Sequence, residues 1–155
     1  MKVFDVMTKN VVTVKKESTI LDAMKVMKEN DIGFLIIEEN NEAIGIITDR
    51  DIVLALSKEI SIKTNITKIM KKYIITINEN ETIDKVSDTM GYMQVRRLIV
   101  INDDNKIKGV ISITDLLRYP LLEEHALEAM LEISYSYSTI KGDYDKQLQT
   151  NAYIF

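Results

Sequence analysis

Cysteine is absent from the sequence, and histidine occurs once, as His125. The lack of cysteine excludes disulfide bonds, thiolate catalysis and cysteine-ligated metal sites. A single histidine excludes a metal site built from several histidines and gives little support to a Ser–His catalytic system. No apolar run approaches the roughly 20 residues needed to cross a bilayer, and no signal-peptide segment follows Met1. These absences predict a soluble, cytoplasmic protein without a membrane partner.

An excess of positive charge is also missing. Lysine and arginine together number 20 against 24 acidic residues, which gives a net charge of −4 and a pI near 5.1. Proteins that bind nucleic acid carry a basic surface, so a nucleic-acid partner is not expected. The sequence also contains no P-loop, no nucleophile–base pair and no metal-ligand set, so we do not expect an enzyme.

What the sequence does contain is an internal repeat. A shift of 63 residues aligns Met7 with Met70 and Thr13 with Thr76, and further along it aligns residues 35–37 with 98–100. One extra residue then enters the second copy in the polar stretch 102–105, where a turn would tolerate it. Beyond that point the shift is 64. The repeat predicts two related structural units.

Each copy shows the pattern of a strand, a helix, two strands in a hairpin and a second helix. The strands are expected at 11–14, 34–37 and 44–47, and again at 74–77, 98–101 and 107–111. Thr19 and Thr82 are candidate N-caps of the first helices, and the second helices are expected to begin near Thr48 and Thr114. The fold class is therefore α/β (α+β), a tandem β-α-β-β-α repeat. One thin sheet buries too little alone, so the two copies are expected to pack sheet to sheet.

Three segments follow from this pattern: repeat 1 (1–62), repeat 2 (63–120) and a C-terminal helix with an aromatic-polar tail (121–155). Helical spacing predicts a helix over 121–134 after the chain's one proline, with an apolar stripe. The stripe is expected to pack on its own domain or on a second subunit, and a partner protein is the alternative. Its members are Leu122, Ala126, Ala129, Met130 and Ile133. We expect His125 to be solvated. The tail end, 153–155, either docks on a second subunit or is a free terminus.

The most informative motif stands where the third strand of each copy meets its second helix. The segments are Gly-Ile-Ile-Thr-Asp-Arg-Asp at 45–51 and Gly-Val-Ile-Ser-Ile-Thr-Asp at 109–115. A strand that ends in a helix start presents free backbone N–H groups, which favour an anion. A hydroxyl there (Thr48, Ser112) caps the helix or bonds a phosphate oxygen. An aspartate one turn later (Asp51, Asp115) can accept both hydroxyls of a ribose.

A structural alternative stays open, in which each hydroxyl–aspartate pair only caps its helix. The glycine that begins each motif, Gly45 or Gly109, allows close approach of another backbone or of a ligand.

Both motifs resemble the CBS-domain signature, and with the repeat the resemblance covers about residues 1–120. It implies an adenine nucleotide or adenosyl ligand (AMP, ADP, ATP or S-adenosylmethionine) in one or both of two clefts between the repeats. In one cleft, Ser112 and Asp115 would hold the ligand together with Val12 and Ile32. In the other, Thr48 and Asp51 would act with Ile75 and Val95. For these four apolar residues, core packing is the structural alternative.

Two arginines distinguish the predicted clefts, because a guanidinium group bonds two phosphate oxygens at once. Arg97 resembles the family's phosphate contact and would serve the Asp115 cleft, and Arg50 would serve the Asp51 cleft. Phe34 would stack on a base or close the second cleft.

We therefore expect a non-catalytic regulatory module that requires no cofactor. Mg²⁺ could accompany a phosphate ligand, but no residue cluster indicates it. The module would form a homodimer and transmit ligand binding to a separate protein. The alternative is a ligand-free dimerisation or interaction module.

Overall fold

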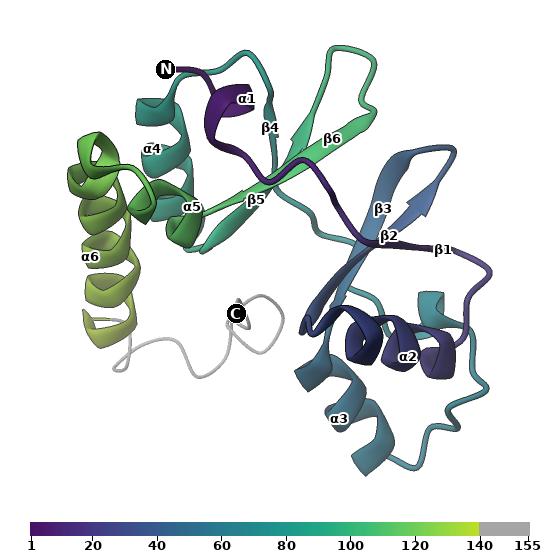
Figure 1. The fold of residues 1–155 in the computed structure, drawn as a ribbon. Coiled ribbons are helices and arrows are strands. Elements are labelled where there is room, and N and C mark those ends of the chain that lie inside the picture. The colour runs from purple at the N-terminus through teal and green to yellow at the C-terminus, as the bar shows by residue number, and fades with distance from the viewer. Residues whose placement is uncertain (140–155) are drawn as a thin grey trace. The chain divides into compact units, whose positions relative to one another are not determined.

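The computed structural model describes residues 1–139, in which the predicted β-α-β-β-α order occurs twice (Figure 1). The elements in chain order are α1 (Val3–Val6), β1 (Thr13–Lys15), α2 (Ile20–Asn30), β2 (Phe34–Glu39), β3 (Glu42–Thr48), α3 (Asp49–Ser57), η1 (Ile66–Lys68), β4 (Thr76–Asn78), α4 (Ile83–Met93), β5 (Arg97–Ile101), β6 (Ile107–Ser112), α5 (Ile113–Leu117), η2 (Pro120–Leu122) and α6 (Glu123–Thr139). The predicted α+β fold is confirmed. The prediction for the end of the tail lies outside the described residues.

Contacts within the chain divide it into two compact units. The first-repeat unit contains Asn10–Ile74 and Asp104–Ile107. The second-repeat unit contains Met1–Lys9, Ile75–Asp103 and the described residues from Lys108 onward. The first nine residues of the chain thus pack with the second repeat. The expected sheet-to-sheet packing of the repeats stays a prediction.

The sheet of the first-repeat unit has the order β1-β2-β3, with β1 parallel and β3 antiparallel to β2. Asn40 and Asn41 join β2 to β3 and have φ angles of 53° and 62°. Asparagine tolerates this left-handed conformation, and two such residues in succession suit a tight hairpin, which confirms the predicted turn. The core beneath the sheet contains the fully buried side chains of Ile20, Leu35, Ile37, Ile47 and Ile66.

The second-repeat unit repeats this sheet as β4-β5-β6, with β4 parallel to β5. Its core joins Met90 of α4 and Leu98 of β5 to Val3 and Val6 of α1. Helix α6 packs along α4 in the same unit (Figure 1). Leu122, Ala126 and Ala129 are buried there, so the predicted apolar stripe packs on its own unit, although Met130 remains 46% exposed.

His125 anchors the start of α6 to the start of α4, so the prediction of a solvated histidine is wrong. Its Nε2 atom lies 3.1 Å from Oδ1 of Asp84, and its side chain is only 26% exposed. The same contact is the main reason that the pKa of Asp84 lies below its ordinary value. No local pattern predicts this pair, because the two residues are 41 positions apart.

Candidate functional site

In each unit, the signature motif forms backbone hydrogen bonds with a short segment that comes before the other repeat in the sequence. In the second-repeat unit, Thr8 exchanges two backbone hydrogen bonds with Val110, at 2.9 and 3.0 Å. In the first-repeat unit, Lys71 exchanges two with Ile46, both at 2.9 Å. Thr8 and Lys71 are related by the repeat offset of 63 residues. Residues 1–9, the leading segment, and residues 65–72, the linker segment, therefore occupy equivalent places in the two units.

The signature glycines are what permit these bridges. A β-carbon on Gly109 would lie 2.7 Å from the backbone oxygen of Thr8, and one on Gly45 would lie 2.9 Å from that of Lys71. Both distances are shorter than ordinary carbon–oxygen contacts, so glycine is needed for the backbones to meet. The predicted close approach at Gly45 and Gly109 is confirmed, and the approaching group is a backbone segment.

The hydroxyl and the carboxylate of each signature form a reciprocal capping box. In α5, Oδ2 of Asp115 accepts from the backbone N–H of Ser112 at 2.8 Å and from its hydroxyl at 2.6 Å. In α3, Oδ2 of Asp51 accepts from the N–H and hydroxyl of Thr48 at 2.9 and 2.7 Å. Helix α5 begins at Ile113, one residue before the predicted start. The box satisfies N–H groups that a helix start leaves unpaired, so one carboxylate oxygen is committed to the fold.

The other carboxylate oxygen of Asp115 faces the leading segment. Its Oδ1 accepts from the hydroxyl of Thr8 at 2.9 Å and from Nη1 of Arg118 at 3.2 Å. The side chain of Asp115 is 6% exposed, whereas that of Arg118 is 66% exposed. A buried carboxylate thus meets one neutral donor and one cation that water can readily solvate.

Arg97 lies near this carboxylate, and its predicted contact with a phosphate stays a prediction. The backbone N–H of Ile113 donates to the carbonyl of Arg96 at 3.1 Å, which ties the start of α5 to the start of β5 and sets the next residue, Arg97, beside the signature. Burial lowers the pKa of the Arg97 guanidinium, and the negative charge of Asp115 opposes that shift. The structure therefore brings Ser112, Asp115 and Arg97 together within one unit.

The corresponding oxygen of Asp51 faces a lysine instead of a threonine. Nζ of Lys71 lies 3.1 Å from Oδ1 of Asp51, with the two side chains 32% and 11% exposed. Arg50 is exposed in the first turn of α3. Phe34 is partly buried at the start of β2 and pairs in register with Thr48.

The four predicted adenine contacts are divided between the units. Val12 and Ile32 pack at the margin of the first-repeat core. Val95 is part of the second-repeat core, and Ile75 packs against it. Core packing therefore accounts for Val95, while the other three are partly buried. Their predicted pairing with signature residues of the other unit stays a prediction.

Sequence reasoning missed three residues that contact the signature carboxylates: Thr8, Lys71 and Arg118. A signal for the first two was present, because Met7-Thr8 aligns with Met70-Lys71 in the repeat. The alignment shows that the two positions are equivalent but carries no information about which repeat each segment contacts. For Arg118, the i,i+3 spacing from Asp115 was the available sign.

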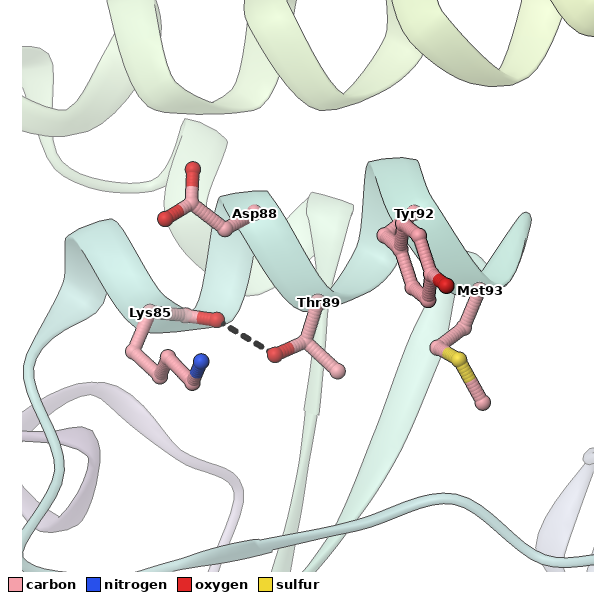
Figure 2. A pocket seen from close by; sticks show the side chains of 5 residues that line it. All are labelled: Lys85, Asp88, Thr89, Tyr92 and Met93. Carbon is pink, nitrogen blue, oxygen red and sulfur yellow. Dashed lines mark hydrogen bonds between the residues drawn. The ribbon is translucent and has the colours of Figure 1, made fainter.

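A separate hollow of about 430 Å³ lies on the outer face of α4 (Figure 2). Lys85, Asp88, Thr89, Tyr92 and Met93 line it, and all five belong to one helix. None of them belongs to a signature, so we do not include this hollow in the candidate site. Among residues 1–139, the structure contains no helix of sufficient length and hydropathy to span a membrane.

Comparisons with known proteins agree with this architecture. The chain is 37% identical over 128 residues to a 17.7 kDa protein of Acidianus ambivalens, with 82% of this chain and 77% of that protein covered. It is 31% identical to the CBS domain-containing protein YhcV of Bacillus subtilis, with 84% and 94% covered.

Among solved structures, the CBS domain pair of protein MJ0100, in complex with 5′-methylthioadenosine and S-adenosyl-L-methionine, matches with a TM-score of 0.66. It is 29% identical, and the match covers 76% of this chain and 94% of that one. The family model of the CBS domain matches residues 3–58 and 66–122, which are the two repeats with their leading and linker segments. The chain therefore belongs to the CBS domain family, as a pair of CBS domains.

Proposed function

We propose that this CBS pair is a non-catalytic regulatory module that binds an adenosyl ligand at its signature aspartates. The observation that carries the proposal is the buried carboxylate of Asp115, which stands with Ser112 and Arg97 in one unit. A carboxylate accepts hydrogen bonds from the two adjacent hydroxyls of a ribose, and a guanidinium group receives a phosphate or carboxylate. The ligands of the MJ0100 pair, methylthioadenosine and S-adenosylmethionine, each contain such a ribose.

In this proposal, the ligand takes over the outer oxygen of Asp115 from its present donors. Oδ2 stays in the capping box, and Oδ1 exchanges the Thr8 hydroxyl for a ribose hydroxyl. Thr8 belongs to the leading segment, so the exchange changes how that segment is held. A ligand shifts a conformational equilibrium only by its difference in affinity for the two states, and the loss of the Thr8 bond supplies such a difference. A separate protein would read the change.

Calorimetric titration of the protein with AMP, ADP, ATP, methylthioadenosine and S-adenosylmethionine tests the proposal. We expect at least one of them to bind, and we expect Asp115→Ala to weaken that binding by about tenfold or more, because a hydrogen bond to a charged group is lost. Failure of all five to bind at near-millimolar concentration contradicts the proposal.

The capping role of Asp115 requires a matched control, because Asp115→Ala also removes a box and lowers stability. Asp22 forms the same reciprocal box with Thr19 at the start of α2, outside both signatures. Asp22→Ala should lower the melting temperature and leave ligand affinity unchanged. Affinity is therefore compared at a temperature where both variants are folded.

One observation favours a second candidate function, a ligand-free dimerisation module. Both oxygens of Asp115 and of Asp51 already have protein donors, as expected of carboxylates that serve only the fold. Exposed Val53, Leu54 and Leu56 on α3 offer an apolar surface for a second copy. Sedimentation should show a homodimer under either function, so calorimetry separates the two.

A further inference from the structure

The two signatures differ at one position that the repeat makes equivalent. Thr8 and Lys71 make the same pair of backbone bridges, and each side chain reaches the outer oxygen of its signature aspartate. A neutral hydroxyl stands 2.9 Å from Asp115, and an ammonium group stands 3.1 Å from Asp51. The two signatures can therefore be compared within one chain, because their backbone bridges are the same and only the charge of the contacting side chain differs.

This difference in charge determines which group a ribose hydroxyl must displace from each aspartate. At Asp115, a ribose hydroxyl replaces a hydroxyl, so one neutral donor is exchanged for another. At Asp51, a ribose hydroxyl that takes Oδ1 separates an ion pair whose members are 11% and 32% exposed. Separating a charge pair that is largely shielded from water is unfavourable unless another group of opposite charge replaces the lost partner.

A phosphate on the same ligand is such a group. The ammonium group of lysine stands on a flexible stem of four carbons, so it can leave the carboxylate and contact an anion nearby. Lysine binds phosphate as a point charge. Uncharged adenosine offers nothing in exchange, and the sulfonium of an adenosyl ligand would add a second cation. Arg118, which also contacts Asp115, does not create the same demand, because its side chain is 66% exposed and water solvates it.

We propose that Lys71 is a specificity-determining residue, which makes the Asp51 signature select a phosphorylated adenosine over an uncharged one. This inference rests on the proposed function, since it presupposes that ribose binds the signature aspartates. The ion pair between Lys71 and Asp51 would disfavour the binding of ligands that carry no anionic group.

Two methionines allow the two signatures to be followed separately. Met70 precedes Lys71 and packs on Gly45, whereas Met7 precedes Thr8 and packs on Gly109. In protein labelled with ¹³C at the methionine methyl groups, the Met70 signal reports the Asp51 signature and the Met7 signal reports the Asp115 signature. Titrations with AMP and with adenosine then give a dissociation constant for each ligand at each place.

The test compares the wild-type protein with Lys71→Thr, which places at this position the residue that the chain already uses at Thr8. We expect the wild-type Met70 signal to respond to AMP at a concentration at least tenfold lower than to adenosine. Lys71→Thr should reduce that ratio by about tenfold. The control is Lys72→Thr, which removes the same charge from an exposed neighbour and should leave the ratio unchanged.

The outcomes separate this inference from the function on which it rests. An unchanged AMP-to-adenosine ratio in Lys71→Thr overturns the role of Lys71 while binding itself stands. A response of Met7 alone also overturns it, because the Asp51 signature then takes no ligand. If neither methyl signal responds to adenosine, AMP, ADP, ATP, methylthioadenosine or S-adenosylmethionine, the proposed function fails and the inference fails with it.

Discussion

Glu38 is a buried carboxylate whose charge contributes to the stability of the first-repeat sheet. Its Oε1 atom accepts from Nζ of Lys15 at 2.8 Å and from the hydroxyl of Thr13 at 2.9 Å. These bonds join β1 to β2 at the end of their parallel pairing. The bond from Lys15 is the largest cause of a pKa below the ordinary value of 4.5, and the Thr13 bond adds to it.

A carboxylate with a lowered pKa stabilises the fold at high pH. Its contribution is complete above the unfolded value of 4.5 and disappears as the pH falls through the lower folded value. We therefore predict that Glu38→Gln lowers the free energy of unfolding at neutral pH by about 1–2 kcal/mol. The difference from wild type should shrink as the pH falls below 4.5, as measured by urea unfolding at a series of pH values.

Glu39 is the control for this prediction. It pairs with Lys16, the residue that follows β1, but both side chains are 41% exposed. Exposed ion pairs contribute little, so Glu39→Gln should change stability only slightly at any pH. An equal loss for both substitutions would mean that burial does not set the contribution of Glu38.

At the scale of elements, helices α2, α3 and α5 share a complete capping box, whereas the box of α4 is incomplete. Helices α2, α3 and α5 each have aspartate at the third position, which accepts from the N-cap backbone. In α4 that position is Lys85. The Thr82 hydroxyl accepts from the backbone N–H of Lys85, but the lysine side chain offers no acceptor for the backbone N–H of Thr82. A lysine in the first turn also opposes the helix dipole.

We predict that Lys85→Gln stabilises the protein by about 0.5 kcal/mol, because the amide oxygen supplies the missing acceptor and the unfavourable charge is removed. Glutamine is preferred to aspartate here because Asp84 and Asp88 already carry negative charge nearby. Thermal unfolding monitored by circular dichroism measures the change. The reverse substitution, Asp22→Lys in α2, should destabilise the protein, and a stabilising effect there would contradict the capping argument.

Most elements could be predicted because their signals are local. Thr19 and Thr82 lie where polar turns meet helical spacing, and both are N-caps in the structure. The signature carboxylates were found for the same reason, since Ser112 and Asp115 are three residues apart. Contacts between distant residues could not be predicted. Nothing in the sequence around Thr8 indicates a bond to Asp115, because a two-residue bridge has no hydrophobic pattern that names its partner.

At the scale of the whole molecule, the leading segment belongs to the second-repeat unit. Val3 is fully buried in its core, and the backbone N–H of Val3 donates to Glu81 at 3.0 Å. Val14, eleven positions later, is buried in the core of the first-repeat unit. Two valines close in sequence thus stabilise different units.

We predict that Val3→Ala and Val14→Ala loosen opposite parts of the chain. Each substitution removes two buried methyl groups and should lower the free energy of unfolding by about 2 kcal/mol. Hydrogen exchange measured by mass spectrometry should show faster exchange in α4 and β5 for Val3→Ala, and in α2 and β2 for Val14→Ala. Faster exchange in α2 and β2 for Val3→Ala would place the leading segment with the first repeat.

The leading segment also has a consequence for the time course of synthesis. Residues 1–9 are translated well before their partners, because the core that covers Val3 includes Leu98 and Ile111. At roughly 5–20 residues per second, this segment waits on the order of 5–20 seconds for its partners to leave the ribosome. The linker segment, in contrast, reaches a first-repeat sheet whose strands have already been made. Val3 and Val6 are therefore synthesised long before the side chains that bury them, and they stay without their core partners until the second repeat forms.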